Sequence, residues 1–87
     1  MRNLYTNSLE ADIRQACNAA GASEPERNRD GILETTLADG ETTVVIVPDE
    51  ALRLVFKQDG TVTGTASLTG HMASPVMIAL LLENANI

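Results

Sequence analysis

The sequence predicts an α+β domain in which a four-stranded antiparallel β-meander is flanked by an N-terminal and a C-terminal helix, in the order α-β-β-β-β-α. Asp-Gly pairs recur at 30–31, 39–40 and 59–60, and Asp-Gly favours chain reversal because Gly adopts positive φ without steric cost. The runs between these pairs are rich in Val, Ile, Leu and Thr, which is typical of strands joined by tight turns. Helical apolar patterns stand on both sides of this region, and we expect both helices to pack on one face of the sheet.

The composition fits a single domain, residues 1–87, with an aliphatic core. Hydrophobic residues make up 44% of the chain, yet Tyr5 and Phe56 are its only aromatic residues. Core stability must therefore come from many Leu, Ile, Val and Ala contacts, at roughly 1.5–3 kcal/mol for each large side chain that is fully buried. A helix layer on a sheet suits such a core better than a fold built around an aromatic cluster.

The first helix is predicted to begin at Asn7, acting as N-cap, with Glu10 three residues later to complete a capping box. Gly21 is expected just beyond its C-terminal end. Residues 22–30 show no apolar periodicity and are expected to form a solvated connecting loop. The helix carries one apolar stripe with helical spacing, made of Leu9, Ile13, Ala16, Cys17 and Ala20.

The four expected strands cover residues 32–38, 42–47, 52–58 and 61–68. The second strand is apolar on both faces, which predicts a central or covered position in the sheet. The third also begins like a helix, because Pro48 is followed by two acidic residues. We favour a strand, since Leu-Val-Phe before an Asp-Gly pair suits a hairpin. One helical turn at 48–51 ahead of the strand is the alternative that satisfies both signals.

The last hairpin is expected to have a three-residue loop, Gln58-Asp59-Gly60, with a bulge. A two-residue loop would place Phe56 opposite Thr63, which pairs an apolar with a polar position. The longer loop pairs Phe56 with Val62 instead and places Gly60 in the left-handed region.

Small residues on the apolar side of the fourth strand, Gly64 and Ala66, predict that a helix approaches the sheet closely there. A larger side chain would then have no room. Gly64→Val is accordingly expected to overpack the core at a cost of roughly 1–3 kcal/mol.

The last helix is expected to have Ser74 as N-cap and Pro75 at its first position. Residues 76–82 are all apolar, and a helix without a polar face is typically buried on every side. A small monomer with one other short helix offers little cover for it. We therefore expect a homodimer whose interface includes this helix and the second strand, through Val76, Met77, Leu80, Leu81, Ile87, Val44 and Ile46.

The net charge of −6, from twelve acidic and six basic residues, argues against direct nucleic-acid binding, which needs a basic surface. It argues equally against adsorption to an anionic membrane. The longest apolar run, residues 76–82, is far too short to span a bilayer. A lone cysteine, Cys17, is consistent with a reducing compartment, and the N-terminus lacks the apolar stretch of a signal peptide. We expect a cytoplasmic protein.

Residues suited to catalysis or metal binding are nearly absent. His71 is the only histidine and Cys17 the only cysteine, and nothing in their spacing brings them together as a nucleophile pair. The chain also lacks the spacings of zinc sites, calcium loops and phosphate-binding loops. We expect no catalytic residues, no metal site and no cofactor. A small enzyme that uses His71 is the third of three functional hypotheses.

The favoured hypothesis is a small acidic, non-enzymatic protein-interaction module that self-associates through its apolar C-terminal helix. The alternative is an acidic inhibitor or regulator, in one form a nucleic-acid mimic, that binds a basic surface of another protein. Its acidic surface would comprise Asp39, Glu41 and Asp59, which a meander gathers at one end of the sheet. Turn formation already accounts for much of this acidity.

Overall fold

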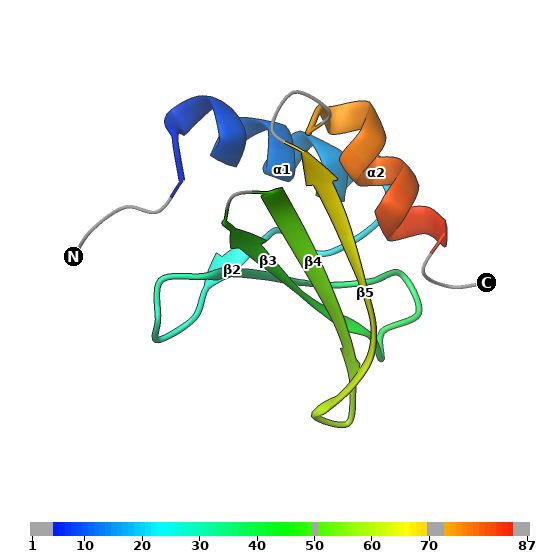
Figure 1. Ribbon diagram of the computed structural model, residues 1–87. Coiled ribbons are helices and arrows are strands. Elements are labelled where there is room, and N and C mark those ends of the chain that lie inside the picture. Colours follow the sequence, from blue (N-terminus) through cyan, green and yellow to red (C-terminus); the bar gives the residue numbers. More distant parts are fainter. Residues whose placement is uncertain (1–4, 50, 70–72, 85–87) are drawn as a thin grey trace.

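The structure is a computed structural model that describes residues 5–49, 51–69 and 73–84. Two helices cover one face of an antiparallel sheet (Figure 1), which confirms the α+β class. The sheet has five strands, one more than the sequence predicts. The elements are α1 (Asn7–Ala19), β1 (Glu26–Arg27), β2 (Leu33–Thr36), β3 (Thr43–Pro48), β4 (Ala51–Gln58), β5 (Thr61–Thr69) and α2 (Pro75–Asn84).

Helix α1 has Thr6, and not Asn7, as its N-cap. The Thr6 backbone is extended, and its Oγ1 accepts a hydrogen bond of 3.0 Å from the Leu9 N–H. Asn7 is therefore the first helical residue. The Glu10 carboxylate does not complete a capping box, because it forms ion pairs with Arg14 and Arg27.

The C-terminal end of α1 lies at the predicted place. Gly21 has a φ of 73°, and the Ala22 N–H reaches back to the Cys17 carbonyl oxygen at 2.9 Å. This is the glycine-dependent cap that sequence rules anticipate. The predicted apolar stripe is confirmed, since Ile13, Ala16 and Cys17 are buried.

The strands form a simple meander in the order β1-β2-β3-β4-β5. The central position of β3 confirms the expectation drawn from its apolar residues on both faces. Val44 and Ile46 point into the core with no exposed surface. Val45 and Val47 lie on the opposite face, which the helices leave uncovered, and are half-buried.

The segment predicted as a loop, residues 22–30, contains the additional strand β1. Glu26 lies opposite Glu34, and Arg27 lies opposite Leu33. The strand is only two residues long and both are exposed, so it has no apolar alternation by which a sequence pattern would reveal it. A side-chain hydrogen bond of 2.6 Å from Asn28 Nδ2 to Glu34 Oε2 supports this pairing.

The strand predicted at residues 52–58 is confirmed as β4. The described residues of the segment 48–51 form no helical turn, because Pro48 and Ala51 belong to strands. Pro48 is the last residue of β3 and Ala51 the first of β4. Pro48 is already opposite Leu52 in the ladder. The proline therefore stands at a strand end, a position that tolerates its missing N–H.

The predicted three-residue loop at the last hairpin is wrong. Gln58 lies opposite Thr61, so the loop is the two-residue Asp59-Gly60, with φ of 52° and 77° at these residues. Positive φ at both positions matches the twist of the flanking strands.

The predicted bulge exists, but it lies in β5 beyond the loop. Lys57 is opposite Val62 and Phe56 is opposite Gly64, which leaves Thr63 as the extra residue. The shift puts Val62 on the uncovered face, 52% exposed.

The predicted close approach of a helix at Gly64 is also wrong. A Cβ atom at this position would have no other atom within 4 Å. Gly64 lies beside the bulge, toward the hairpin end of β5, where nothing presses on it. Overpacking is therefore not expected from a larger residue there.

The core lies between the inner face of the sheet and the two helices, which pack on each other. Its members come from every major element and from the segment before α1. They are Tyr5, Ile13, Ala16, Cys17, Leu33, Leu37, Val44, Ile46, Leu52, Leu54, Phe56, Leu68, Ile78, Ala79 and Leu82.

Candidate functional site

Helix α2 carries most of the residues that the sequence predicts at an interface. It begins as predicted. The Met77 N–H donates to Ser74 Oγ at 3.2 Å, and the Ile78 N–H donates to the Ser74 carbonyl oxygen at 3.0 Å. Pro75 occupies the first turn, where its missing N–H has no consequence. This cap fixes where α2 begins.

One side of α2 is buried and the other is not. Ile78, Ala79 and Leu82 belong to the core. Val76 and Leu80 lie on the outer side and keep 69% and 44% of their surface exposed. They are four residues apart and so are neighbours on the helix surface. The rest of the chain thus covers only one side of this apolar helix.

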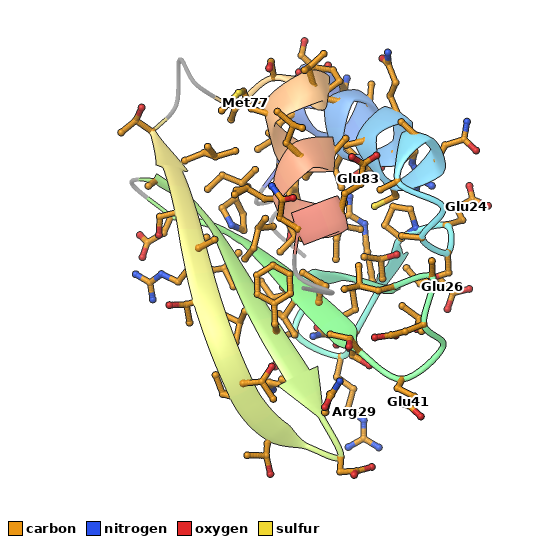
Figure 2. All side chains as sticks on the ribbon, turned by 90° about the vertical axis from the view of Figure 1, so that its right-hand side faces the viewer. Glu24, Glu26, Arg29, Glu41, Met77 and Glu83 are labelled. Carbon is orange, nitrogen blue, oxygen red and sulfur yellow. The ribbon has the colours of Figure 1, made fainter. Side chains whose placement is uncertain are left out.

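The flank of α2 beside the sheet edge is apolar as well. Met77 and Leu81 are partly buried and pack against the core. Figure 2 shows Met77 on the side of α2 that faces β5, whereas Glu83 lies on the side toward α1. An apolar surface of Val76, Met77, Leu80 and Leu81 therefore runs from the outer side of α2 to its β5 flank. We call these four residues the α2 surface.

A shallow groove of about 230 Å³ separates α2 from α1 beside this surface. Ala19 and Ala79 contribute small side chains to it, and Gln15 and Glu83 add the polar groups. Val76 and Leu80 lie along the same groove. The groove is suited to an apolar side chain from a partner, since its lining is mostly apolar.

The other residues assigned to the interface are placed differently. Val44 and Ile46 are on the inner face of β3 with 0% exposure, because the helices cover that face. They offer no surface to a partner, so the interface cannot include them without unfolding the core. Ile87 lies outside the described residues.

The three acidic residues proposed as an alternative site lie in two turns at one end of the sheet. The Asp39 carboxylate forms hydrogen bonds within its own turn. Its Oδ1 accepts hydrogen bonds from the backbone N–H groups of Glu41 and Thr42, and its Oδ2 accepts one from Thr42 Oγ1. These hydrogen bonds, those from Thr42 first, lower the pKa of the Asp39 carboxyl. Glu41 and Asp59 line a common hollow with Gly40 and Gln58, so two of the three carboxylates are available to a partner.

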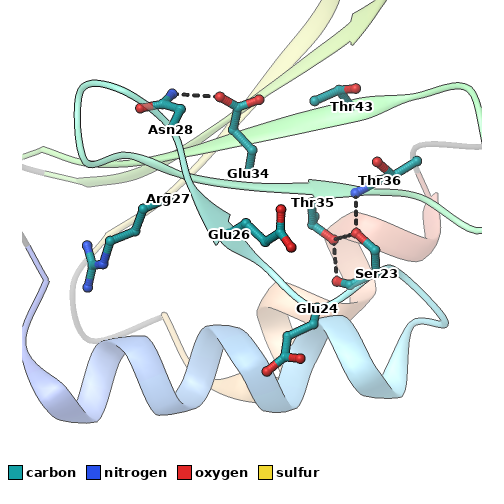
Figure 3. A pocket seen from close by; sticks show the side chains of 9 residues that line it. All are labelled: Ser23, Glu24, Glu26, Arg27, Asn28, Glu34, Thr35, Thr36 and Thr43. Atoms are coloured by element: carbon teal, nitrogen blue, oxygen red, sulfur yellow. Dashed lines mark hydrogen bonds between the residues drawn. The ribbon is translucent and has the colours of Figure 1, made fainter.

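A hollow of about 530 Å³ lies between the segment after α1 and β2 (Figure 3). Several of its polar groups bond to one another. Thr35 Oγ1 donates to the Ser23 carbonyl oxygen at 2.6 Å, and the Thr36 N–H donates to Ser23 Oγ at 2.8 Å. No buried side-chain nitrogen or oxygen in the described part of the chain is without a partner. The polar residues that line the hollow therefore have a structural role: their hydrogen bonds hold the segment around β1 to the sheet.

The two candidate nucleophilic or basic side chains do not form a site in the described residues. Cys17 is fully buried as a free thiol, and this burial raises its pKa, which disfavours the reactive thiolate. His71 lies outside the described residues. Across residues 5–49, 51–69 and 73–84, no three His, Cys, Asp or Glu side chains are grouped so as to hold a metal ion.

Neither helix of the described chain is long and apolar enough to cross a membrane. Comparison of the chain with protein-family models, with curated proteins and with solved structures finds no match.

Proposed function

We propose that this protein is a non-enzymatic interaction module that forms a homodimer through the α2 surface. The observation that carries the proposal is the exposure of Val76 and Leu80 on a helix with no polar face. Large apolar side chains that are adjacent on a surface and continuous with the core are typical of a protein-protein contact. We place the protein in the cytoplasm, for which the free thiol of Cys17 is suited.

Charge favours α2 as the place where two copies meet. Each chain carries a net charge of −6, so two copies repel each other unless their acidic surfaces are kept apart. Within Pro75–Asn84, Glu83 is the only charged residue, and it lies on the side toward α1 (Figure 2). Contact through the α2 surface thus brings together a part of each copy that carries little charge.

The energetic scale indicates that the α2 surface needs additional contacts. Full burial of a large aliphatic side chain contributes roughly 1.5–3 kcal/mol, and Val76 and Leu80 are already partly covered. Loss of translational and rotational freedom on association costs an estimated 4–15 kcal/mol. In a symmetric dimer the exposed parts of these side chains, 69% of Val76 and 44% of Leu80 in each copy, correspond to roughly 3–7 kcal/mol. This matches only the low end of the cost, so a second area of contact would stabilise the dimer.

The test is the mass of the particle in solution, by sedimentation or light scattering over a range of concentrations. Wild type is expected to be dimeric, and Leu80→Glu is expected to shift it to monomer, because a charge would have to be buried at the contact. Leu80 is a better position than Leu81, which packs against the core. Ala11→Glu is the matched control: it adds the same charge at an exposed position of α1 and should leave the dimer intact. A monomeric wild type at high concentration would overturn the proposal.

The alternative function, an acidic inhibitor or regulator, is supported by the shared hollow of Glu41 and Asp59. Two exposed carboxylates at one end of a rigid sheet suit a basic partner surface. Such binding would weaken with added salt, because exposed charges are screened. Glu41→Gln combined with Asp59→Asn should abolish it while leaving self-association through α2 unchanged.

A further inference from the structure

The strand β5 has an open edge. It is the last strand of the sheet, and in the described chain it pairs with β4 alone. Its other side therefore presents a row of backbone N–H and C=O groups. β5 is nine residues long and contains only Thr, Val, Gly, Ala, Ser and Leu, so it has neither the charges nor the proline with which proteins usually protect an edge strand.

The opposite edge of the sheet, formed by β1, is protected against pairing with another strand. There β1 is two residues long and consists of Glu26 and Arg27, both exposed. Short length and charged side chains are established ways to prevent edge-to-edge pairing. One edge is thus closed to a partner strand and the other is open.

We propose that β5 of one copy pairs antiparallel with β5 of a second copy about a two-fold axis, so that the two sheets become one. This inference rests on the proposed function, because it supplies a second area of contact for the dimer through α2. The occupant of the edge is a second copy since the strand is complementary to itself. In a two-fold pair each residue faces its counterpart or a symmetry-related neighbour, and like charges placed so would repel. β5 carries none.

The position of α2 supports the same arrangement. Figure 2 shows the edge of β5 and the Met77 flank of α2 on the same side of the molecule. Strands lie about 4.8 Å apart and packed helices about 8–10 Å apart, so one helix covers about two strands. Joining the two β5 edges therefore brings the two α2 helices to packing distance over the shared sheet. Met77 and Leu81 of each copy would then lie toward the other copy, with Leu80, three residues from Met77, beside them on the helix surface.

The bulge restricts where β5 can pair. A bulge disrupts the regular backbone spacing, and Thr63 is the extra residue here. The regular part of β5 is therefore Gly64 to Thr69. Residues opposite each other in an antiparallel pair must lie on the same face of the sheet, which places the two-fold axis at a single residue. An axis at Ser67 pairs Thr65 with Thr69 and keeps the pairing clear of the bulge.

Single cysteines along β5 test this geometry. Ser67→Cys, Thr65→Cys and Thr61→Cys all replace exposed residues, so each variant should fold. Opposite residues lie within the Cα distance of about 4.4–6.8 Å that a disulfide requires. Each residue adds about 3.3 Å along the strand, so Thr65 would lie about 13 Å from its own counterpart. Under mild oxidation Ser67→Cys should give most of the crosslinked dimer, and Thr61→Cys almost none.

A control and a second variant separate the possible failures. Asn18→Cys, exposed on α1, should not crosslink, and the native Cys17 stays buried in every variant. Ser67→Lys should weaken the dimer at least tenfold, whereas Thr61→Lys should not. A dimer that Leu80→Glu dissociates, but in which Ser67→Cys forms no more disulfide than Asn18→Cys, would overturn the β5 pairing and leave the proposed function standing. A monomeric wild type would overturn both.

Discussion

The Tyr5 hydroxyl donates a hydrogen bond to the carbonyl oxygen of Ile46, 41 residues later in the chain. The same hydroxyl accepts a hydrogen bond of 2.8 Å from the Leu33 N–H. Leu33 and Ile46 lie opposite each other in the β2–β3 ladder, so one side chain from before α1 bridges two strands. Tyr5 is 2% exposed, and the Arg27 guanidinium lies over its ring at 5.3 Å. The hydroxyl thus fixes the start of α1 to the middle of the sheet.

Tyr5→Phe is expected to lower the free energy of unfolding by about 1–3 kcal/mol. The substitution keeps the ring but removes the hydroxyl that pairs with the Leu33 N–H and the Ile46 carbonyl, and loss of a partner for a buried polar group costs about this much. Urea denaturation followed by circular dichroism at neutral pH measures the difference. A loss below about 0.5 kcal/mol, the low end for a net hydrogen bond, would contradict the role assigned to the hydroxyl.

The stability should also fall at alkaline pH because of Tyr5. Burial raises its pKa above 10.0, although the hydrogen bond from Leu33 and the charge of Arg27 act in the opposite direction. The neutral hydroxyl is the favoured form in the folded state, so its contribution is complete below pH 10.0 and is lost as the pH rises through the folded pKa.

Tyr5 is the only tyrosine and the chain has no tryptophan, so tyrosinate absorbance reports on this one group. A native pKa at or below that of the unfolded chain would contradict the prediction. Burial also raises the pKa of Cys17 from 9.0. Measurements in a Cys17→Ala background therefore isolate the tyrosine contribution, which Tyr5→Phe should remove.

Asp39 should make the free energy of unfolding depend on pH in the acidic range. Hydrogen bonds from Thr42 and Glu41 lower its pKa below 3.8, so the folded state favours the carboxylate. Its contribution is present above pH 3.8 and is lost as the pH falls through the folded pKa. Asp39→Ala should thus be less stable than wild type at neutral pH, and the difference should shrink in strong acid. Glu41→Gln removes a charge from the same turn without removing these bonds and should change little.

Local sequence rules predicted several, though not all, of the parts of the fold that local chemistry determines, since the N-cap of α1 is Thr6 and not Asn7. The caps at Ser74 and Gly21 depend on residues within one turn of the helix, and both lie where expected. The strand β1 depends on side-chain hydrogen bonds such as that between Asn28 and Glu34, which no apolar pattern records. The bulge at Thr63 was misplaced, because the preference of Asp59-Gly60 for a two-residue turn prevailed over a continuous apolar register.

The sequence predicts only part of the candidate site. The absence of a polar face marked α2 as unusual, but only packing determines which of its sides is covered. Ile78 and Leu82 face the core, and Val76 and Leu80 do not. Val44 and Ile46 were assigned to the interface because β3 is apolar on both faces. Its central position under the helices explains that pattern without a partner.

Gly64→Ala is expected to stabilise the protein by about 0.4–1 kcal/mol. Gly64 is not among the described glycines with positive φ, and an added Cβ would meet no atom within 4 Å. Alanine therefore fits the native backbone and reduces the conformational freedom of the unfolded chain. Gly60→Ala is the matched control: its φ of 77° disfavours a Cβ, and it should lose about 1–2 kcal/mol. Thermal and urea unfolding of both variants measures the contrast. Destabilisation by Gly64→Ala equal to that by Gly60→Ala would mean that the backbone at position 64 is closely covered after all.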